Sequence, residues 1–475
     1  MNNKVLYLII GLLTNSLFTL FFLIMTYTSI GKMEFSYLTG LFILENILIV
    51  FDLSINNYII KSISSEKDKT KKKIIIYFFK KIIIFSIIFY IINYLLLKKI
   101  FWDKIIGDQN ELILFITLII PGIIIVRIFI NFLRAILIGN SNQIETAKIQ
   151  IFSTFFKFIV FIFFLFFFKT MQGLLIAYFL CFFIELLFYI ISTYKKVINN
   201  LFIFSYYKIK NNYNYSYLKS IFLLSLTIIF FFNIDRVFLS YNATADILGE
   251  YNFIRTLLLG FFILSSAYFY TLLPDISGPI KNNYLIKKKI LQSFKSLNII
   301  LIFCIVICGF FFEKIIKDFG LIHFFMIENF LIFKIILVAT YFNMTGQIFL
   351  SFQIANSYLK IPTLINLVII ILSLIIINPT FINYSVEGVA TLYLLMNLSS
   401  FLINAFFLNL SNGKIFTKKL LYNLLKNTIY YFACSIIIMN LINYYIYSFS
   451  KIIFYIFLAI ILFFAFYKSQ KYLKS

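Results

Sequence analysis

Residues 220–241 read SIFLLSLTIIFFFNIDRVFLSY. This run is long enough to cross the hydrocarbon core of a bilayer, which takes about 20 apolar residues. It nevertheless carries an adjacent acid and base, Asp235 and Arg236. An ionisable side chain at mid-bilayer costs about 3 kcal/mol on insertion scales, so such residues usually mark a transport pathway or a paired site. The stretch therefore predicts a membrane-spanning helix with functional polar positions.

The rest of the chain repeats this pattern. Hydrophobic residues make up 62% of the 475 residues and charged residues only 13%, whereas about 25% of a soluble domain is charged. The predicted fold class is therefore an all-α polytopic membrane protein with about 14 transmembrane helices. The predicted spans lie at 5–27, 36–60, 79–97, 111–138, 150–168, 173–193, 220–241, 250–273, 298–313, 331–355, 362–378, 387–410, 427–447 and 451–468.

The distribution of basic residues predicts the orientation of these spans. With the N-terminus in the cytoplasm, about 28 basic residues fall in cytoplasmic loops and about 8 outside, as the positive-inside rule requires. The formal net charge of +24 is thus assigned to the cytoplasmic ends of helices, and no nucleic acid partner is expected. Both termini are expected to be cytoplasmic.

Several function classes are disfavoured by the motifs of the chain. It has no phosphate-binding glycine loop, nucleotide-binding domain or nucleophile elbow, so neither an enzyme nor a built-in ATPase is expected. Cys181, Cys304, Cys308 and Cys434 lie in apolar runs and have no metal-like spacing with His323. No metal or other cofactor is predicted.

The two halves of the chain show a weak internal repeat. Span one ends near Gly31 before Phe35 opens the next span, and span seven ends near Tyr241 before Gly249 and Tyr251 open span eight. A repeat with an even number of spans predicts two lobes related by a pseudo-twofold axis along the membrane normal. The predicted organisation is an N-lobe (1–198), an inter-lobe linker (199–219), a C-lobe (220–412) and two additional spans (413–475).

Ionisable residues lie inside the predicted spans of both halves. Guanidinium groups bind phosphate well through their planar fork, so a cavity lined by cations favours an anionic cargo. The four cations predicted to bind the cargo are Arg127, Lys157, Arg236 and Arg255. The four acids predicted to serve in ion coupling or charge pairing are Glu45, Asp52, Asp235 and Glu185.

Simpler interpretations remain open for several of these residues. Asp52 lies near a cytoplasmic helix end and fits snorkelling equally well, and Arg255 fits it too. Lys157 and Glu185, on adjacent helices, fit a buried structural ion pair as well as a functional site. Asp235 and Arg236 are adjacent in sequence and point about 100° apart on a helix, which predicts different partners for the two side chains.

The motifs together resemble a known family. Residues 232–239, FNIDRVFL, followed by residues 247–251, ILGEY, resemble the span-seven signature of the polysaccharide-export flippases of the Wzx type. These belong to the multidrug/oligosaccharidyl-lipid/polysaccharide (MOP) exporter superfamily. The resemblance covers essentially the whole chain, although Ser54 stands where the family often has glycine. Further segments similar to the family pattern are 29–35, 52–54, 134–147 and 387–390.

The resemblance implies a flippase of the bacterial inner membrane. Its cargo would be an undecaprenyl-pyrophosphate-linked oligosaccharide, such as an O-antigen or capsule repeat unit, moved to the outer leaflet by alternating access. A coupling proton or sodium ion and the polysaccharide polymerase machinery are further implied partners. A MATE-like cation or drug antiporter of the same superfamily is the alternative, although its cavity would favour acids over bases. A flippase for the peptidoglycan precursor is a second alternative.

Overall fold

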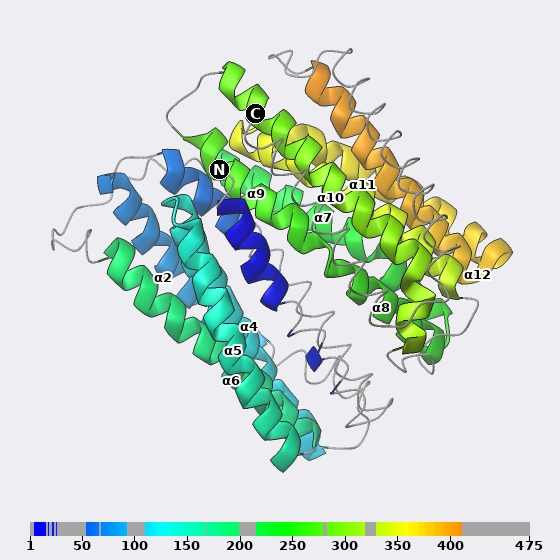
Figure 1. Cartoon of the computed structure of the whole chain (residues 1–475), viewed down its shortest axis with the longest axis horizontal. Helices are drawn as coiled ribbons and strands as arrows, with labels where there is room; N and C mark the ends of the chain where they lie inside the picture. Colours follow the sequence, from blue (N-terminus) through cyan, green and yellow to red (C-terminus); the bar gives the residue numbers. More distant parts are fainter. Residues whose placement is uncertain are drawn as a thin grey trace. The chain divides into compact units, whose positions relative to one another are not determined.

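The computed structural model describes residues 4–15, 18, 21, 22, 25, 54–65, 68–92, 110–168, 170–198, 215–278, 283–318 and 329–410 (Figure 1). Regular structure in these ranges is helical throughout. The labelled helices are α2 (Asp68–Ile92), α4 (Asn110–Gly139), α5 (Gln143–Phe167), α6 (Met171–Thr193), η2 (Tyr194–Ile198), α7 (Tyr215–Asn242), α8 (Ala245–Leu259), α9 (Phe262–Ser277), α10 (Asn283–Asp318), α11 (Asn329–Ala355) and α12 (Lys360–Leu410). A short apolar helix, Lys4–Asn15, precedes them.

The predicted fold class is confirmed. Eight stretches among the described residues are long and apolar enough to cross a membrane, and the chain is a multi-pass membrane protein of all-α class. The spans predicted at 427–447 and 451–468, and most of the span at 36–60, lie outside the described residues. The span predicted at 331–355 corresponds to α11.

Several helices extend beyond the predicted spans. The span predicted at 298–313 belongs to α10, which begins at Asn283 and ends at Asp318, and α5 begins at Gln143 where the prediction began at 150. The length of an apolar run indicates only the part of a helix that lies in the hydrocarbon core. Backbone hydrogen bonding can continue the helix beyond this part into polar residues. The span predicted at 250–273 contains a break, since α8 ends at Leu259 and α9 begins at Phe262.

The element α12 consists of two helices joined across a kink. Ser385 has φ 52° and ψ −140°, and Pro379 lies shortly before it. A positive φ is outside the right-handed helical region, so the first helix ends at Ser385. The two helices correspond to the spans predicted separately at 362–378 and 387–410.

Substitution of Gly388 tests how closely the chain packs at this kink. A Cβ on Gly388 would lie 2.9 Å from the carbonyl carbon of Thr380 and 3.0 Å from the Cβ of Tyr384. Gly388→Ala should therefore lower the free energy of unfolding by about 1–3 kcal/mol, as overpacking does. The matched control is Gly346→Ala in α11, where a Cβ meets nothing within 4 Å. It should be neutral or stabilise by up to about 1 kcal/mol. Thermal unfolding in detergent measures both, and equal effects would contradict the prediction.

The described residues fall into two compact units. The N-terminal unit comprises those within Asn3–Ile229 together with 273–278, and the C-terminal unit comprises those within Phe230–Leu272 and from residue 283 onward. The lobe limits expected from the sequence, including the linker at 199–219, stay a prediction. Each unit is described by itself below.

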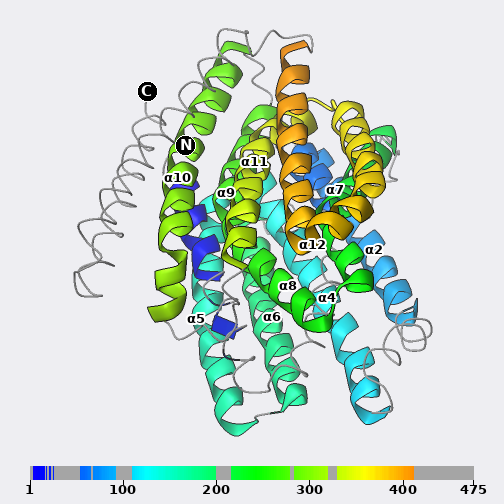
Figure 2. The ribbon, with the colours of Figure 1, turned by 90° about the vertical axis from the view of Figure 1, so that its right-hand side faces the viewer.

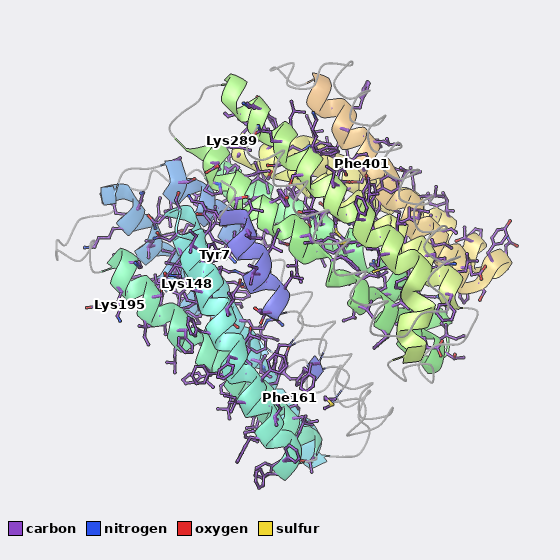
Figure 3. All side chains as sticks on the ribbon, viewed as in Figure 1. Tyr7, Lys148, Phe161, Lys195, Lys289 and Phe401 are labelled. Atoms are coloured by element: carbon purple, nitrogen blue, oxygen red, sulfur yellow. The ribbon has the colours of Figure 1, made fainter. Side chains whose placement is uncertain are left out.

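In the N-terminal unit, α4, α5 and α6 pack against one another (Figure 1). The start of α5 and the end of α6 lie at one end of this group, where Lys148 and Lys195 are found, and Phe161 lies toward the other end (Figure 3). Aromatic residues fill the contact with the first part of the chain: the rings of Phe22 and Phe161 have centroids 4.7 Å apart, as do those of Phe22 and Tyr178. This packing fixes the α5–α6 pair.

In the C-terminal unit, α11 packs against α8, α10 and α12 (Figure 2). Buried amides join α11 to α12: Asn343 donates to Asn397 at 2.7 Å, and Gln353 donates to Asn404 at 3.0 Å. Such hydrogen bonds hold helices together where lipid gives no hydrophobic driving force between them. They set the position of α12 in this unit.

Candidate functional site

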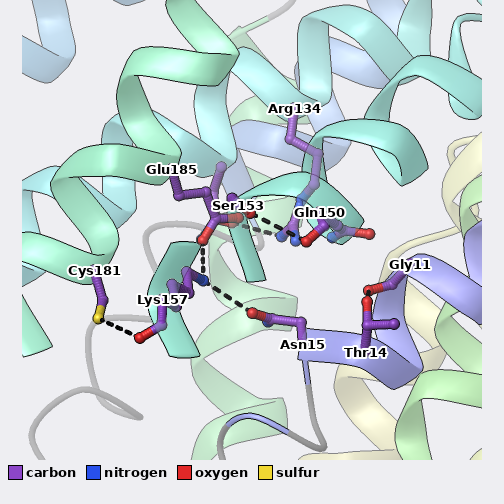
Figure 4. Close-up of polar contacts among 10 residues, drawn as sticks. Gly11, Thr14, Asn15, Arg134, Gln150, Ser153, Lys157, Cys181 and Glu185 are labelled. Atoms are coloured by element: carbon purple, nitrogen blue, oxygen red, sulfur yellow. Dashed lines mark hydrogen bonds and ion pairs between the residues drawn. The ribbon is translucent and has the colours of Figure 1, made fainter. Parts of the chain in front are cut away.

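An ion pair lies inside the N-terminal unit. Lys157 of α5 and Glu185 of α6 contact each other directly (Figure 4), and their side chains are only 1% and 5% exposed. The ammonium group of Lys157 also donates to the side-chain oxygen of Asn15 at 2.9 Å. The ion pair that the sequence left open is thus present. Together with Asn15 it connects α5, α6 and the helix Lys4–Asn15.

The short connection between α5 and α6 brings the two charged residues together. After α5 ends, Thr170 takes an extended backbone conformation and its hydroxyl accepts the Gly173 N–H at 3.2 Å. This side-chain cap satisfies a free donor at the start of α6. The chain then reverses, so the middle of α6 packs beside the middle of α5.

A phenyl ring joins a second cation to this pair. The Nζ of Lys157 lies 4.8 Å from the ring centroid of Phe182, and the guanidinium carbon of Arg127 lies 5.1 Å from the same centroid. Cations are attracted to the faces of aromatic rings. We call Arg127, Lys157, Glu185, Phe182 and Asn15 the Lys157 cluster. It contains two cations and one carboxylate.

A second buried cluster lies in the C-terminal unit and begins at Asp235 of α7. One carboxylate oxygen, Oδ2, accepts the hydroxyl of Tyr251 at 2.6 Å, and the Nε of Arg255 lies 3.2 Å from the same oxygen. Tyr251 and Arg255 are one helical turn apart on α8, so a single face of α8 holds the carboxylate.

Arg255 is held by the protein on several sides. Besides Asp235, it donates from Nη2 to the backbone carbonyl of Phe232 at 2.7 Å. Its guanidinium carbon also lies 3.7 Å from the ring centroid of Tyr393 of α12. Stacking of guanidinium on an aromatic face is favourable. Asp235, Tyr251, Arg255 and Tyr393, together with the adjacent Arg236, form what we call the Asp235 cluster.

Arg236 differs from Arg255 in its partners. Its side chain is buried, with 7% of the residue exposed, and its Nε has no hydrogen-bond partner. In the part of the chain that the structure describes, no carboxylate forms an ion pair with it. Asp235 is engaged by Arg255 and Tyr251 through Oδ2, and its other oxygen is unpartnered. The positive charge of Arg236 is therefore the one that this cluster leaves uncompensated.

The structure groups most of the predicted site residues. It brings Arg127, Lys157 and Glu185 together in one unit, and it brings Asp235 and Arg255 into direct contact in the other, next to Arg236. Their role in cargo binding or ion coupling stays a prediction. The two remaining acids, Glu45 and Asp52, lie outside the described residues.

Sequence reasoning missed the uncharged members of both clusters. They are Asn15, Phe182, Tyr251 and Tyr393. In a chain with 64 Phe and 33 Tyr, an aromatic residue near a buried charge does not stand out. Tyr251 was noticed only as part of a turn motif. The described residues contain no group of three or more His, Cys, Asp or Glu that could hold a metal ion.

Solved structures share this fold. No protein-family model and no curated protein matches the sequence. The chain is similar to the MATE multidrug transporter DinF-BH, solved in complex with a ligand, with a TM-score of 0.71 at 14% identity over 88% of this chain and 96% of that one. It is similar to the Vibrio cholerae MATE transporter VcmN, with a TM-score of 0.66 at 13% identity over 86% and 97%.

A third similar structure is a MOP superfamily transporter from Pyrococcus furiosus. Its TM-score is 0.64 at 12% identity over 87% of this chain and 95% of that one. That protein is described as having a binding pocket of reverse polarity, which suggests a different function for it. The chain therefore has the fold of these solved transporters. At 12–14% identity the similarity shows the fold alone.

Proposed function

We propose that this protein is a secondary transporter that moves an anionic, amphiphilic cargo. The specific cargo we propose is an undecaprenyl-pyrophosphate-linked oligosaccharide, carried to the outer leaflet by alternating access. The observation that carries the proposal is the buried guanidinium of Arg236, which has no ion-pair partner among the described residues while the neighbouring carboxylate of Asp235 is held by Arg255.

The sign of the buried charge supports an anionic cargo. The Asp235 cluster contains two buried cations and one carboxylate, so it has a surplus of one positive charge. A buried charge is costly unless it is paired. A pyrophosphate supplies the missing negative charge and accepts bidentate hydrogen bonds from arginine.

The membrane potential favours export of such a cargo. Moving one negative charge from the cytoplasm outward gains about 2.3 kcal/mol per 100 mV of potential. A proton or sodium ion, bound at one of the buried carboxylates, would supply further driving force. The candidates among the described residues are Asp235 and Glu185.

A MATE-like cation or drug antiporter is the second candidate, and the structural comparisons support it more directly than they support a lipid-linked sugar. The similar structures include MATE transporters, one of them named as a multidrug transporter. The Pyrococcus furiosus structure, whose binding pocket of reverse polarity suggests a different function for that protein, supports the view that this fold is not limited to one function. The uncompensated buried charge of Arg236 is what favours the anionic cargo here.

Transport by the purified protein in proteoliposomes separates the two candidates. We expect a fluorescent, short-chain polyprenyl-pyrophosphate sugar to become protected from a membrane-impermeant quencher at a rate that depends on the protein. The uncharged polyprenol sugar, which lacks the pyrophosphate, is the matched control and should not be moved. Accumulation of a cationic dye driven by a proton or sodium gradient, with no movement of the pyrophosphate lipid, would overturn the proposal and favour the antiporter.

A further inference from the structure

The buried face of α5 is polar and its exposed face is apolar, the reverse of a helix in a soluble protein. On the exposed face, Phe152, Phe155 and Ile159 are 60%, 64% and 51% exposed, as suits contact with lipid. On the opposite side lie six polar residues, each at most 3% exposed. We call them the α5 polar face: Gln143, Thr146, Gln150, Ser153, Thr154 and Lys157.

The spacing of these residues forms a continuous stripe. Apart from the neighbours Ser153 and Thr154, they recur at three- and four-residue intervals, which places them on one side of a helix. The stripe begins at Gln143, the first residue of α5, and ends at Lys157, where the ion pair with Glu185 lies. It therefore runs from the helix end that the lysine distribution predicts to be cytoplasmic to the Lys157 cluster.

The helix Lys4–Asn15 packs along this stripe. A Cβ on Gly11 would lie 2.9 Å from the Cα of Ala147 and 3.0 Å from the side-chain oxygen of Gln150. At the end of the same helix, Asn15 accepts a hydrogen bond from Lys157 at 2.9 Å. Figure 4 shows Gly11 and Asn15 on this helix together with Gln150 and Lys157. The stripe is thus covered by protein and does not face lipid.

Polar atoms along the stripe lack protein partners. Among the described residues, both side-chain polar atoms of Gln143, the oxygen of Gln150 and the hydroxyl of Thr154 make no hydrogen bond. The hydroxyls of Thr146 and Ser153 donate only to carbonyls of their own helix, at 2.6 and 3.1 Å. Buried polar groups without protein partners are ordinarily satisfied by ordered water. A row of such groups favours a row of water molecules.

We propose that the α5 polar face is a hydrated proton pathway between the cytoplasm and the Lys157–Glu185 ion pair. A proton from cytoplasmic water passes along the stripe to the carboxylate of Glu185. Protonation neutralises Glu185 and frees the charge of Lys157. In the coupled cycle the proton is taken up from one side of the membrane and released to the other, and the stripe is the cytoplasmic part of this route. The proposal rests on ion-coupled transport as proposed above, but not on the identity of the cargo.

The charged surroundings of Glu185 fit this role. Lys157 faces it from α5, and α4 contributes Arg127, which contacts Phe182 one turn before Glu185. Arg134 of α4 donates to the neighbouring Asn131 at 2.5 Å. The helix Lys4–Asn15 contributes the uncharged Asn15, and on α6 itself the thiol of Cys181 donates to the backbone carbonyl of Lys157.

The entrance of the pathway has an acid of its own. Glu145, in the first turn of α5, is partly exposed and accepts a hydrogen bond from Ser192 of α6 at 3.2 Å. A carboxylate at this position attracts protons to the mouth of the stripe. The exposed Lys148 lies on the same part of α5.

Water access can be measured without knowing the cargo. In a variant whose native cysteines are replaced, single cysteines are introduced by Gln150→Cys, Ser153→Cys and Thr154→Cys on the stripe. The matched controls on the lipid side of α5 are Phe155→Cys and Ile159→Cys. Vesicles that expose the cytoplasmic face are treated with a charged, membrane-impermeant thiol reagent. Because only a hydrated thiolate reacts, the stripe positions should react about tenfold faster than the controls.

The relative labelling rates on the two faces of α5 test the proposal. Faster reaction at the stripe from the cytoplasmic side supports a hydrated pathway. Equal rates on the two faces of α5, or faster reaction only from the outside, would overturn it. Ser153→Cys is nearly isosteric, so the measurement remains possible if the Gln150→Cys and Thr154→Cys variants do not fold.

Protonation of Glu185 is tested by infrared difference spectroscopy on the reconstituted protein. A carboxylic acid band that is absent in Glu185→Gln should appear when the reconstituted protein is acidified. If that variant is unstable, the double variant Lys157→Met/Glu185→Gln should lack the band equally. Thr154→Val, which removes one hydroxyl of the stripe, should slow deuterium exchange of the band. A spectrum without a band that depends on Glu185 would overturn the proton pathway while leaving the proposed anionic cargo untouched.

Discussion

Replacing Arg236 with glutamine should strongly reduce transport while leaving the folded protein at least as stable as the wild type. Arg236 is buried and has no ion-pair partner among the described residues, so removing its charge relieves a desolvation cost. If the guanidinium binds a pyrophosphate, the lost charge-assisted hydrogen bonds of about 1.5–3 kcal/mol weaken cargo binding by about 10- to 100-fold. Proteoliposome transport and thermal unfolding in detergent measure the two effects.

Arg255→Gln is the matched control for this experiment, because it removes the same group from the same cluster. Arg255 is paired with Asp235 and stacked on Tyr393, so its removal leaves a buried carboxylate without its cation. Such a change costs about 3–5 kcal/mol of stability. The two variants should therefore differ: Arg236→Gln loses transport and keeps its stability, whereas Arg255→Gln loses stability.

Two further results would contradict this assignment. Normal transport by Arg236→Gln would remove the main support for an anionic cargo, and a large loss of stability in that variant would mean that Arg236 is structural. Arg236→Lys should retain part of the transport, because it keeps the charge and loses the planar fork that binds phosphate oxygens in pairs.

The membrane spans were predictable from apolar length, but their ends and breaks were not. The span expected at 331–355 corresponds closely to α11, since a fully apolar run of this length has few alternatives in a bilayer. By contrast, α5 begins at Gln143, seven residues before the predicted start. The prediction missed these residues because several of them are polar on the interior side. A reading based on hydropathy treats such residues as a loop.

The break between α8 and α9 was missed for a different reason. Gly260 keeps right-handed helical backbone angles, but its N–H bonds the carbonyl of Leu257, three residues earlier, at 3.2 Å, so the helix tightens between α8 and α9. A single glycine in an apolar run is a weak signal, because glycine is common in membrane helices that continue without interruption. Tertiary packing decides whether the helix breaks there.

The charged residues of the candidate site were predictable, and the Lys157–Glu185 pair was one of the open interpretations, but the contacts of the Asp235 cluster were not predicted. Charged residues stand out in an apolar span, so the cations and acids could be named from sequence alone. The contact between Asp235 and Arg255 depends on how α7 packs against α8. Tyr393, which stacks on Arg255, belongs to a helix that is distant in the sequence. No local pattern records these contacts. The adjacency of Asp235 and Arg236 predicted different partners for the two side chains; Asp235 is held by Arg255, whereas Arg236 has no ion-pair partner among the described residues.

Removing either member of the Lys157–Glu185 ion pair should destabilise the protein strongly, and removing both should not. Both side chains are almost fully buried, so Lys157→Met leaves an uncompensated carboxylate and Glu185→Leu an uncompensated ammonium. Each single change should cost about 3–5 kcal/mol in the free energy of unfolding. The double variant puts two apolar side chains in contact and should recover most of this loss, because replacing a buried pair by apolar groups is often nearly neutral.

The double-mutant cycle separates a structural role of the pair from a functional one. Thermal unfolding of the wild type, the two single variants and the double variant gives the coupling free energy, which should be at least about 2 kcal/mol for charges in direct contact. Additive losses would contradict the observed contact. If the stable double variant still binds cargo but no longer couples its movement to a pH gradient, the pair acts in coupling. Full coupled transport would instead assign Lys157 and Glu185 to stability alone, since Asn15, Phe182 and Arg127 remain in place around them.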